Sequence, residues 1–183
     1  GNAFTCDGME DIIPATQALL AAFRRRGFPV VFTTTAYDVT DRNVPGCAAV
    51  AAELAGPAKI DTVIADLAEI HAPTTVAAAT IARFGRIDGL VNAAGITTRG
   101  SVLTGTPQDW DHLFPDNARA GFSLMQAAIA DLQARGAAGS IVNILSMNAH
   151  CGIPELAMYA ATKGAMQTLT RNAAHAHMAD RIR

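Results

Sequence analysis

Short apolar runs alternate with stretches of helical periodicity along most of the chain. The runs at 29–35, 60–65, 87–92 and 140–145 are short and mostly rich in β-branched residues, which is typical of strands buried on both faces of a parallel sheet. Apolar residues at helical spacing predict helices over 11–26, 48–55, 74–84, 107–135 and 153–176. Because alternating strands and helices form βαβ crossovers, the pattern predicts one α/β domain over residues 1–183, with a doubly wound parallel sheet.

The helix that begins at Pro107 carries its own start and interruption signals. Thr106 can cap it, Pro107 suits its first position, and Asp109 can close a capping box with Thr106. Pro115 interrupts the same helix, because proline removes a backbone hydrogen bond and clashes with the preceding turn. We therefore expect a kink close to Asn117.

Composition narrows the classes of function. Half of the 183 residues are apolar and the formal net charge is -2, so the chain can bury a core and has no electrostatic bias toward nucleic acid. Cys6, Cys47 and Cys151 are too scattered for a disulfide framework or a CxxC zinc site. The chain shows neither a signal peptide nor an apolar run long enough to cross a bilayer. We expect a cytoplasmic protein without metal, membrane or nucleic-acid partners.

Polar residues follow three successive predicted strands. Asp66 comes after the run at 60–65, Asn92 ends the next run, and Ser146 follows the run at 140–145. Ligands of open parallel sheets bind outside the carboxyl ends of the strands. These three residues are therefore candidates for a single site, although an acid after a strand is often only a helix cap, which is the alternative for Asp66.

Tyr159 and Lys163 lie four residues apart in the helix predicted over 153–176, so their side chains share one helix face. A free tyrosine has a pKa of about 10 and is a poor base at neutral pH. A neighbouring ammonium stabilises the phenolate and lowers that pKa. The pair is suited to proton transfer, whereas the alternative interpretation is an ordinary pair on a helix surface.

Three motifs together resemble the short-chain dehydrogenase/reductase family: LVNAAGI at 90–96, SIVNILSM at 140–147 and YAATK at 159–163. Their order matches, as does the separation of thirteen positions between Ser146 and Tyr159, and the similarity runs from about Cys47 to Arg183. The resemblance implies a Rossmann-like, three-layer αβα fold and a homo-oligomer. It also implies an oxidoreductase that uses NAD or NADP to interconvert a small alcohol and a ketone.

The same resemblance implies a role for each candidate residue. Tyr159 passes a proton to or from the substrate oxygen, Ser146 hydrogen-bonds that oxygen, and Lys163 binds the nicotinamide ribose and tunes Tyr159. Asn117 holds a water for proton relay, whereas the alternative is that it caps the half-helix after Pro115. The residues implied to bind the cofactor are Asp66, Leu67, Asn92, Ala93, Ala94, Gly95, Tyr159 and Lys163.

Both ends of the sequence depart from the family pattern. Gly1 and Gly8 have neither the spacing nor the preceding strand of the glycine-rich turn that holds a pyrophosphate. The chain also stops at Arg183, before the family's further strand. We therefore expect a sheet that is incomplete at both ends, and a lowered affinity for the cofactor.

Residues 1–45 resemble a second family, the isochorismatase-like cysteine hydrolases, through NAFT and IIPATQALLAAFRRRGFPVVFTTTAYD. The core of the dehydrogenase type then covers residues 46–183, and a recombined chain is one explanation. Two alternatives to the oxidoreductase stay open: a non-catalytic scaffold of the same fold, and a hydrolase of the isochorismatase type. NAD and NADP also stay open, with Asp38 as the nearest acid in favour of NAD.

Overall fold

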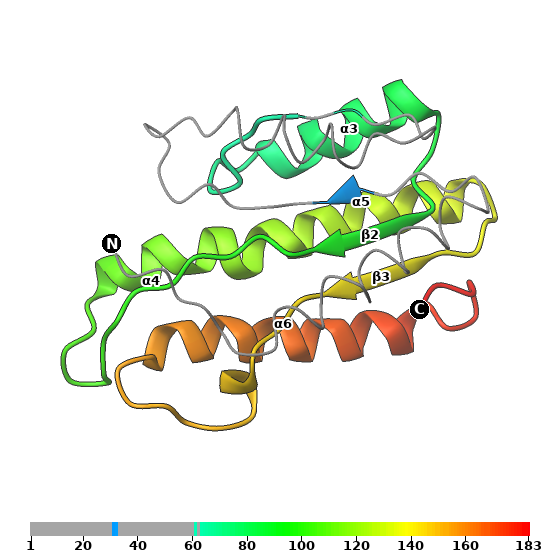
Figure 1. Ribbon diagram of the computed structural model, residues 1–183. Helices are drawn as coiled ribbons and strands as arrows, with labels where there is room; N and C mark the ends of the chain where they lie inside the picture. Colours follow the sequence, from blue (N-terminus) through cyan, green and yellow to red (C-terminus); the bar gives the residue numbers. More distant parts are fainter. Residues whose placement is uncertain (1–30, 33–60, 62) are drawn as a thin grey trace, which may run out of the picture.

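The computed structural model describes residues 31–32, 61 and 63–183, which form part of a parallel sheet with helices packed on it (Figure 1). The strands are β1 Val31–Phe32, β2 Gly89–Asn92 and β3 Ser140–Asn143, in the order β1-β2-β3. Both pairings are parallel, as predicted. The register places Asn92 opposite Asn143, so two asparagines end neighbouring strands at the same edge of the sheet.

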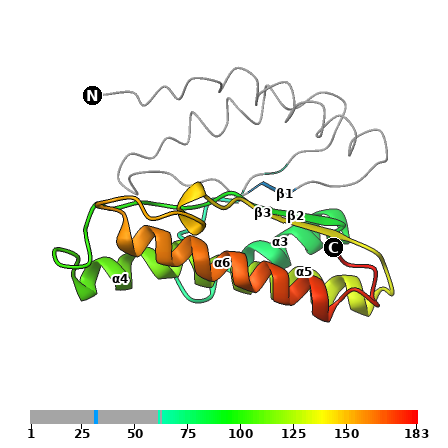
Figure 2. The ribbon, with the colours of Figure 1, turned by 90° about the horizontal axis from the view of Figure 1, so that it is seen from below.

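The helices of the described residues are α3 Ala72–Phe84, α4 Pro107–Phe114, α5 Ala120–Ala134 and α6 Ala157–Ala176. A 3-10 turn, Met147–Ala149, follows β3. Figure 2 shows α3, α5 and α6 on the same face of the sheet. Because α4 and α5 connect two parallel neighbours, β2 and β3, this part of the chain is a βαβ crossover.

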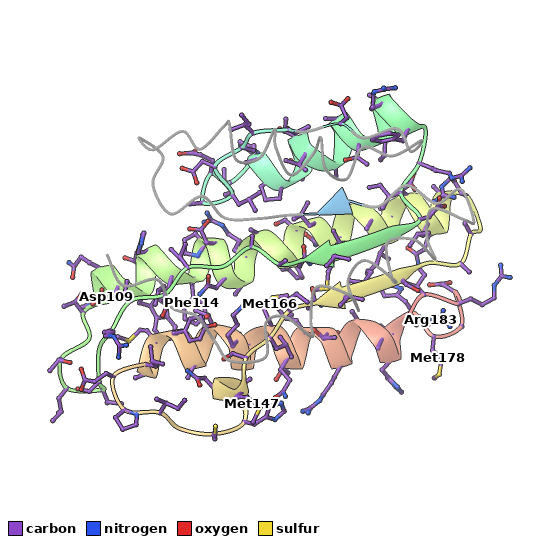
Figure 3. All side chains as sticks on the ribbon, viewed as in Figure 1. Asp109, Phe114, Met147, Met166, Met178 and Arg183 are labelled. Atoms are coloured by element: carbon purple, nitrogen blue, oxygen red, sulfur yellow. The ribbon has the colours of Figure 1, made fainter. Side chains whose placement is uncertain are left out.

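The core lies between the sheet and the helices α3, α5 and α6. Its buried members include Val76, Ala77, Leu90, Leu124, Met125, Ala128, Leu132 and Met166. Met166 reaches from α6 to Gly121 of α5, where an added Cβ would lie 2.9 Å from the Met166 methyl group (Figure 3). Gly121 therefore allows α5 and α6 to pack closely beneath the ends of the strands.

The long predicted helix is divided by a π-helical turn, Pro115–Arg119, between α4 and α5. The Ala120 N–H donates to the Pro115 carbonyl, five residues earlier, instead of the usual four. Proline has no N–H to donate and crowds the preceding turn, so the helix widens at this point. A π-helical turn thus lies where a kink was expected close to Asn117, and it buries Asn117 and Ala118.

The predicted strand over 60–65 is wrong for the residues that the structure describes there. Residues 63–65 have no regular secondary structure. Val63 and Ile64 are 48% and 74% exposed. A central parallel strand is buried on both faces, so apolar composition alone gave the wrong assignment for this segment.

The helix predicted over 153–176 begins later, at Ala157. Glu155 has a φ of 64°, in the left-handed region, and a residue in this conformation cannot continue a right-handed helix. Tyr159 therefore lies in the first turn of α6 rather than in its middle. The predictions for residues 1–30 and 33–60, including Gly1 and Gly8, lie outside the described residues.

The chain after α6 returns to the sheet beside β3. Ile182 forms a parallel bridge with Gly139. The Ile141 N–H donates to the Arg183 carbonyl at 2.7 Å, and the Arg183 N–H donates to the Gly139 carbonyl at 3.1 Å. Figure 3 places Arg183 next to this edge. The residues at 181–183 therefore extend the parallel ladder beyond β3.

The start of α4 offers a first test of the local structure. Thr106 accepts a hydrogen bond from the Asp109 N–H at 3.2 Å, and its own N–H donates to Asp109 at 3.0 Å, at the helix start in Figure 3. Thr106→Ala removes this box and lowers the free energy of unfolding by about 1 kcal/mol. Urea denaturation measures the loss. Thr97→Ala, at another exposed threonine, is the control, and equal midpoints for the two variants would contradict the prediction.

Candidate functional site

The carboxyl ends of β2 and β3 border a narrow cavity beneath the sheet. Its lining consists of Leu67, Asn92, Ala94, Asp116, Asn117, Ala120, Gly121, Leu124, Asn143, Ile144, Lys163 and Met166. These residues come from β2, β3, the π-helical turn, α5 and α6, together with the segment before α3. Five of them were predicted for the site, so strand ends, the long helix and the YAATK helix do meet at one place.

Lys163 is the buried cation of this cavity. The side chain is only 5% exposed, and its Nζ donates a hydrogen bond to the Ile144 carbonyl at 3.0 Å. Burial lowers the pKa of Lys163 below its usual range, because an ammonium group loses hydration there. Nζ also lies 5.7 Å from the centre of the Tyr159 ring, one helical turn earlier. The ammonium therefore lies close to the Tyr159 ring, and its effect on the hydroxyl group stays a prediction.

Asn117 joins three segments of the site. Its Oδ1 accepts from the Ile96 N–H at 2.7 Å, and its Nδ2 donates to the Ile96 carbonyl at 2.8 Å and to Thr162 Oγ1 at 3.1 Å. A Cβ on Gly95 would lie 3.3 Å from both Asn117 Oδ1 and Lys163 Nζ. The glycine thus lets the backbone after β2 approach both side chains. The role of Asn117 as a water holder stays a prediction.

The contacts of Asn117 give a second test. Asn117→Ala leaves the Ile96 N–H and carbonyl without their partner, while the Thr162 hydroxyl keeps its bond to the Tyr159 carbonyl, and an unsatisfied buried group costs about 1–3 kcal/mol. We expect a loss of stability of that size in chemical denaturation. Asn172→Ala, at an exposed position of α6, serves as the matched control. Equal unfolding midpoints for the two variants would disprove the bridging role.

A chain of amide groups links the strand ends to α6. Asn92 Nδ2 donates to Asn143 Oδ1 at 2.7 Å, and Asn143 Nδ2 donates to Thr170 Oγ1 at 2.9 Å. Sequence reasoning missed Asn143 and the buried Thr162. The signal for Asn143 is its position opposite Asn92 once the two strands are aligned in register. Among the described residues, Asn92 Oδ1 is a buried atom without a hydrogen-bond partner.

Ser146 begins the 3-10 turn after β3. Its Oγ accepts a hydrogen bond from the Asn148 N–H at 3.2 Å, which leaves the hydroxyl hydrogen available to donate. The side chain is half-buried. Its meeting with the Tyr159 hydroxyl stays a prediction.

The predicted cofactor residues fall into buried and exposed positions. Leu67 packs against the core, whereas Ala93 is exposed. Asp66 is also exposed, and its Oδ1 accepts from the Ala68 N–H at 2.9 Å. That contact is a local turn, since the N-cap of α3 is His71 and not Asp66, and adenine contact stays a prediction. Asp116, which the sequence reasoning missed, brings a carboxyl group to the lining of the cavity, whereas Asp66 is not part of that lining.

The sequence matches the family described as short chain dehydrogenase over residues 32–183. The chain belongs to this family. The match covers both strand ends, the π-helical turn and the YAATK helix. It therefore confirms the main resemblance that these motifs carry.

Curated relatives in this family are dehydrogenases and reductases. The trans-4-hydroxycyclohexanecarboxylate dehydrogenase of Sinomonas cyclohexanicum is 38% identical over 109 residues, which are 60% of this chain and 41% of that protein. The gluconate 5-dehydrogenase of Gluconobacter oxydans is 37% identical over 116 residues, or 63% of this chain and 45% of that protein. The chain therefore spans less than half the length of these two relatives.

Solved structures of the family share the fold. A gluconate 5-dehydrogenase from Burkholderia cenocepacia in complex with NADP and tartrate has a TM-score of 0.69 at 34% identity, and the match covers 78% of this chain and 56% of that one. A metagenomic short-chain oxidoreductase in complex with NADP has a TM-score of 0.73 at 29% identity, with 84% and 66% covered. The predicted Rossmann-like α/β class is confirmed.

The second resemblance gains no support. The family match begins at residue 32, inside the stretch of 1–45 that was compared with isochorismatase-like hydrolases. Apart from β1, that stretch lies outside the described residues. A recombined chain is therefore not carried further.

The described part of the chain has neither a membrane-spanning helix nor a cluster of metal ligands. No helix in it is both long and apolar enough to span a bilayer. In the same part, no three His, Cys, Asp or Glu side chains are grouped where they could hold a metal ion. Cys151 is an exposed free thiol.

Proposed function

We propose that this chain is part of an NAD(P)-dependent oxidoreductase that interconverts an alcohol and a carbonyl compound at Ser146, Tyr159 and Lys163. The observation that carries the proposal is the position of Lys163. Its buried ammonium lies at the strand ends, is held by the Ile144 carbonyl, and is 5.7 Å from the Tyr159 ring. The named dehydrogenases and reductases among the relatives support the same activity.

The groups at the strand ends fit a dinucleotide. A sugar hydroxyl both donates and accepts hydrogen bonds, and the strand ends offer the unpartnered acceptor Asn92 Oδ1 and the donor Lys163 Nζ. Gly95 permits a close backbone approach beside them. The groups that we propose to hold NAD or NADP are Asp66, Leu67, Asn92, Ala93, Ala94, Gly95, Tyr159 and Lys163. When bound, the nicotinamide exchanges a hydride with the substrate carbon.

The protein's own groups then handle the proton. The Tyr159 hydroxyl gives its proton to the carbonyl oxygen in reduction and recovers one in oxidation. Lys163 binds the nicotinamide ribose and holds its ammonium beside the Tyr159 ring. Ser146 donates its hydroxyl hydrogen to the substrate oxygen, while its Oγ continues to accept the hydrogen bond from the Asn148 N–H. Asn117 holds the segment after β2 in place and binds the relay water.

An assay of the purified protein tests this function. We expect consumption of NADH or NADPH that depends on a small ketone, and the reverse reaction with the matching alcohol, in an absorbance assay. Alkylation of the cysteines leaves this activity unchanged, whereas a cysteine hydrolase loses its activity. Absence of turnover and of cofactor binding across a panel of small alcohols and ketones would favour the non-catalytic scaffold.

We also propose a homo-oligomer that forms through α5 and α6. The two helices border a groove lined in part by Phe122, Met125, Ile129 and Leu169, and Phe122 is 40% exposed. An exposed apolar surface of this kind is typical of protein contacts. Light scattering should give at least the mass of a dimer, and a monomer at micromolar concentration would contradict the proposal.

A further inference from the structure

The π-helical turn brings a second ionisable group into the cofactor cavity. Asp116 and Asn117 are consecutive residues of this turn, and both line the cavity together with Lys163. Asn117 is engaged with Ile96 and Thr162. Asp116 is half-buried and has no part in the proposed proton transfer. The proposed function therefore assigns no role to the Asp116 carboxyl group.

The charged groups around Asp116 come from four parts of the structure. Asp66 approaches from the segment before α3, His112 from α4, and Arg119 from the same turn. Lys163 of α6 lines the same cavity. Burial, and then the charge of Asp66, raise the pKa of Asp116, while His112 and Arg119 act in the opposite direction. The Arg119 guanidinium donates a hydrogen bond to the Ala68 carbonyl, in the segment before α3.

A second observation concerns another polar group of the same cavity. Asn92 is only 8% exposed, and its Oδ1 is a buried acceptor with no partner among the described residues. An unpaired buried acceptor costs free energy unless a donor reaches it. Asn92 and Asp116 line the same cavity, so a ligand that covers the cavity takes both groups away from water.

We propose that Asp116 makes dinucleotide binding dependent on a proton: the cavity binds its ligand with the Asp116 carboxyl protonated, so affinity falls as the pH rises. This inference rests on the proposed function and adds a mode of regulation to the same site. Two effects both weaken the binding of the ligand when Asp116 is ionised. A ligand that covers the cavity desolvates the carboxylate further, and its phosphates repel a negative charge. Protonation of Asp116 removes both costs.

The sign of the pH dependence follows from linkage. If the ligand favours the protonated carboxyl, binding takes up as much as one proton, and Kd rises by up to about tenfold per pH unit above the pKa of Asp116 in the free protein. The dependence disappears when the carboxyl is replaced by an amide. Asp116→Asn keeps the shape of the side chain and mimics the protonated state.

Calorimetric titration with NADH and NADPH tests the inference. Measurements in buffers of different ionisation enthalpy, between about pH 5 and pH 8, give Kd and the number of protons taken up. The unmutated protein should take up protons, and its Kd should rise with pH. Asp116→Asn should bind without proton uptake from this site and on the order of tenfold more tightly at the upper end of the range. Asp111→Asn, an exposed position of α4 with the same change of charge, should behave as the unmutated protein.

The possible outcomes separate this inference from the function on which it rests. Saturable binding with the same proton uptake in Asp116→Asn and in the unmutated protein overturns the role of Asp116 and leaves the proposed function standing. An equal effect of Asp111→Asn also overturns it, because net charge alone would then explain the change. Absence of binding in all three proteins removes the proposed function itself. Proton uptake by the unmutated protein can be measured without any variant. If the unmutated protein takes up no protons anywhere in this pH range, the inference is contradicted.

Discussion

Replacement of Tyr159 by phenylalanine will reduce kcat by about 10²- to 10⁴-fold, the usual contribution of a positioned acid or base. Phenylalanine keeps the ring that lies beside Lys163 and removes only the hydroxyl group. The first turn of α6 and the cavity below it should therefore keep their packing. The loss is expected in the chemical step, with the Kd of the cofactor changed by less than about threefold.

Steady-state kinetics and a cofactor titration on the same preparation measure both quantities. Thr168→Val is the matched control, because it removes a hydroxyl group at an exposed position of the same helix. We expect normal turnover from that control. If Tyr159→Phe keeps kcat within about tenfold of the unmutated protein, another group transfers the proton and the proposed mechanism fails.

Replacement of Lys163 by methionine will weaken cofactor binding and slow turnover together. A hydrogen bond from a charged group contributes about 1.5–3 kcal/mol, so we expect the Kd of the cofactor to rise on the order of ten- to a hundredfold. Turnover falls as well, because the ammonium beside the Tyr159 ring is lost. Arg171→Met, at an exposed position of the same helix, removes a positive charge elsewhere and should change neither quantity by more than about threefold.

The effect of Lys163→Met on the free energy of unfolding should depend on pH. Burial lowers the pKa of Lys163, so between the lowered value and the ordinary value of 10.5 the unfolded chain binds more protons than the folded one. The stability of the unmutated protein relative to Lys163→Met should therefore rise with pH through that window. Denaturation midpoints of the two proteins in alkaline buffers check this, and a constant difference would show that Lys163 is not desolvated.

Residue spacing predicted the elements whose structure depends on local sequence. Tyr159 and Lys163 share a helix face because they are four residues apart, and the capping box of Thr106 follows from a local hydrogen-bonding pattern. Pro115 likewise disturbs the helix where it stands, whatever surrounds it. In each case the physical cause lies within a few residues, so the sequence contains the information.

Features that depend on residues far apart in the sequence could not be predicted from residue spacing. Nothing local distinguishes Asp116 from any other acid on a helix, because only the widened turn places it in the cavity beside Lys163. Ile64 belongs to an apolar run, yet its 74% exposure depends on the packing around it. The bond from Lys163 to the Ile144 carbonyl also requires α6 to lie beneath β3.

Calorimetric titration of NADH and NADPH into the unmutated protein and Lys163→Met tests the central claim most directly, because every proposed step needs a dinucleotide at the strand ends. The account predicts saturable binding of at least one of the two to the unmutated protein, and a clearly weaker affinity in the variant. Absence of binding heat at about 1 mM of either dinucleotide, or equal affinities of the two proteins, would contradict it.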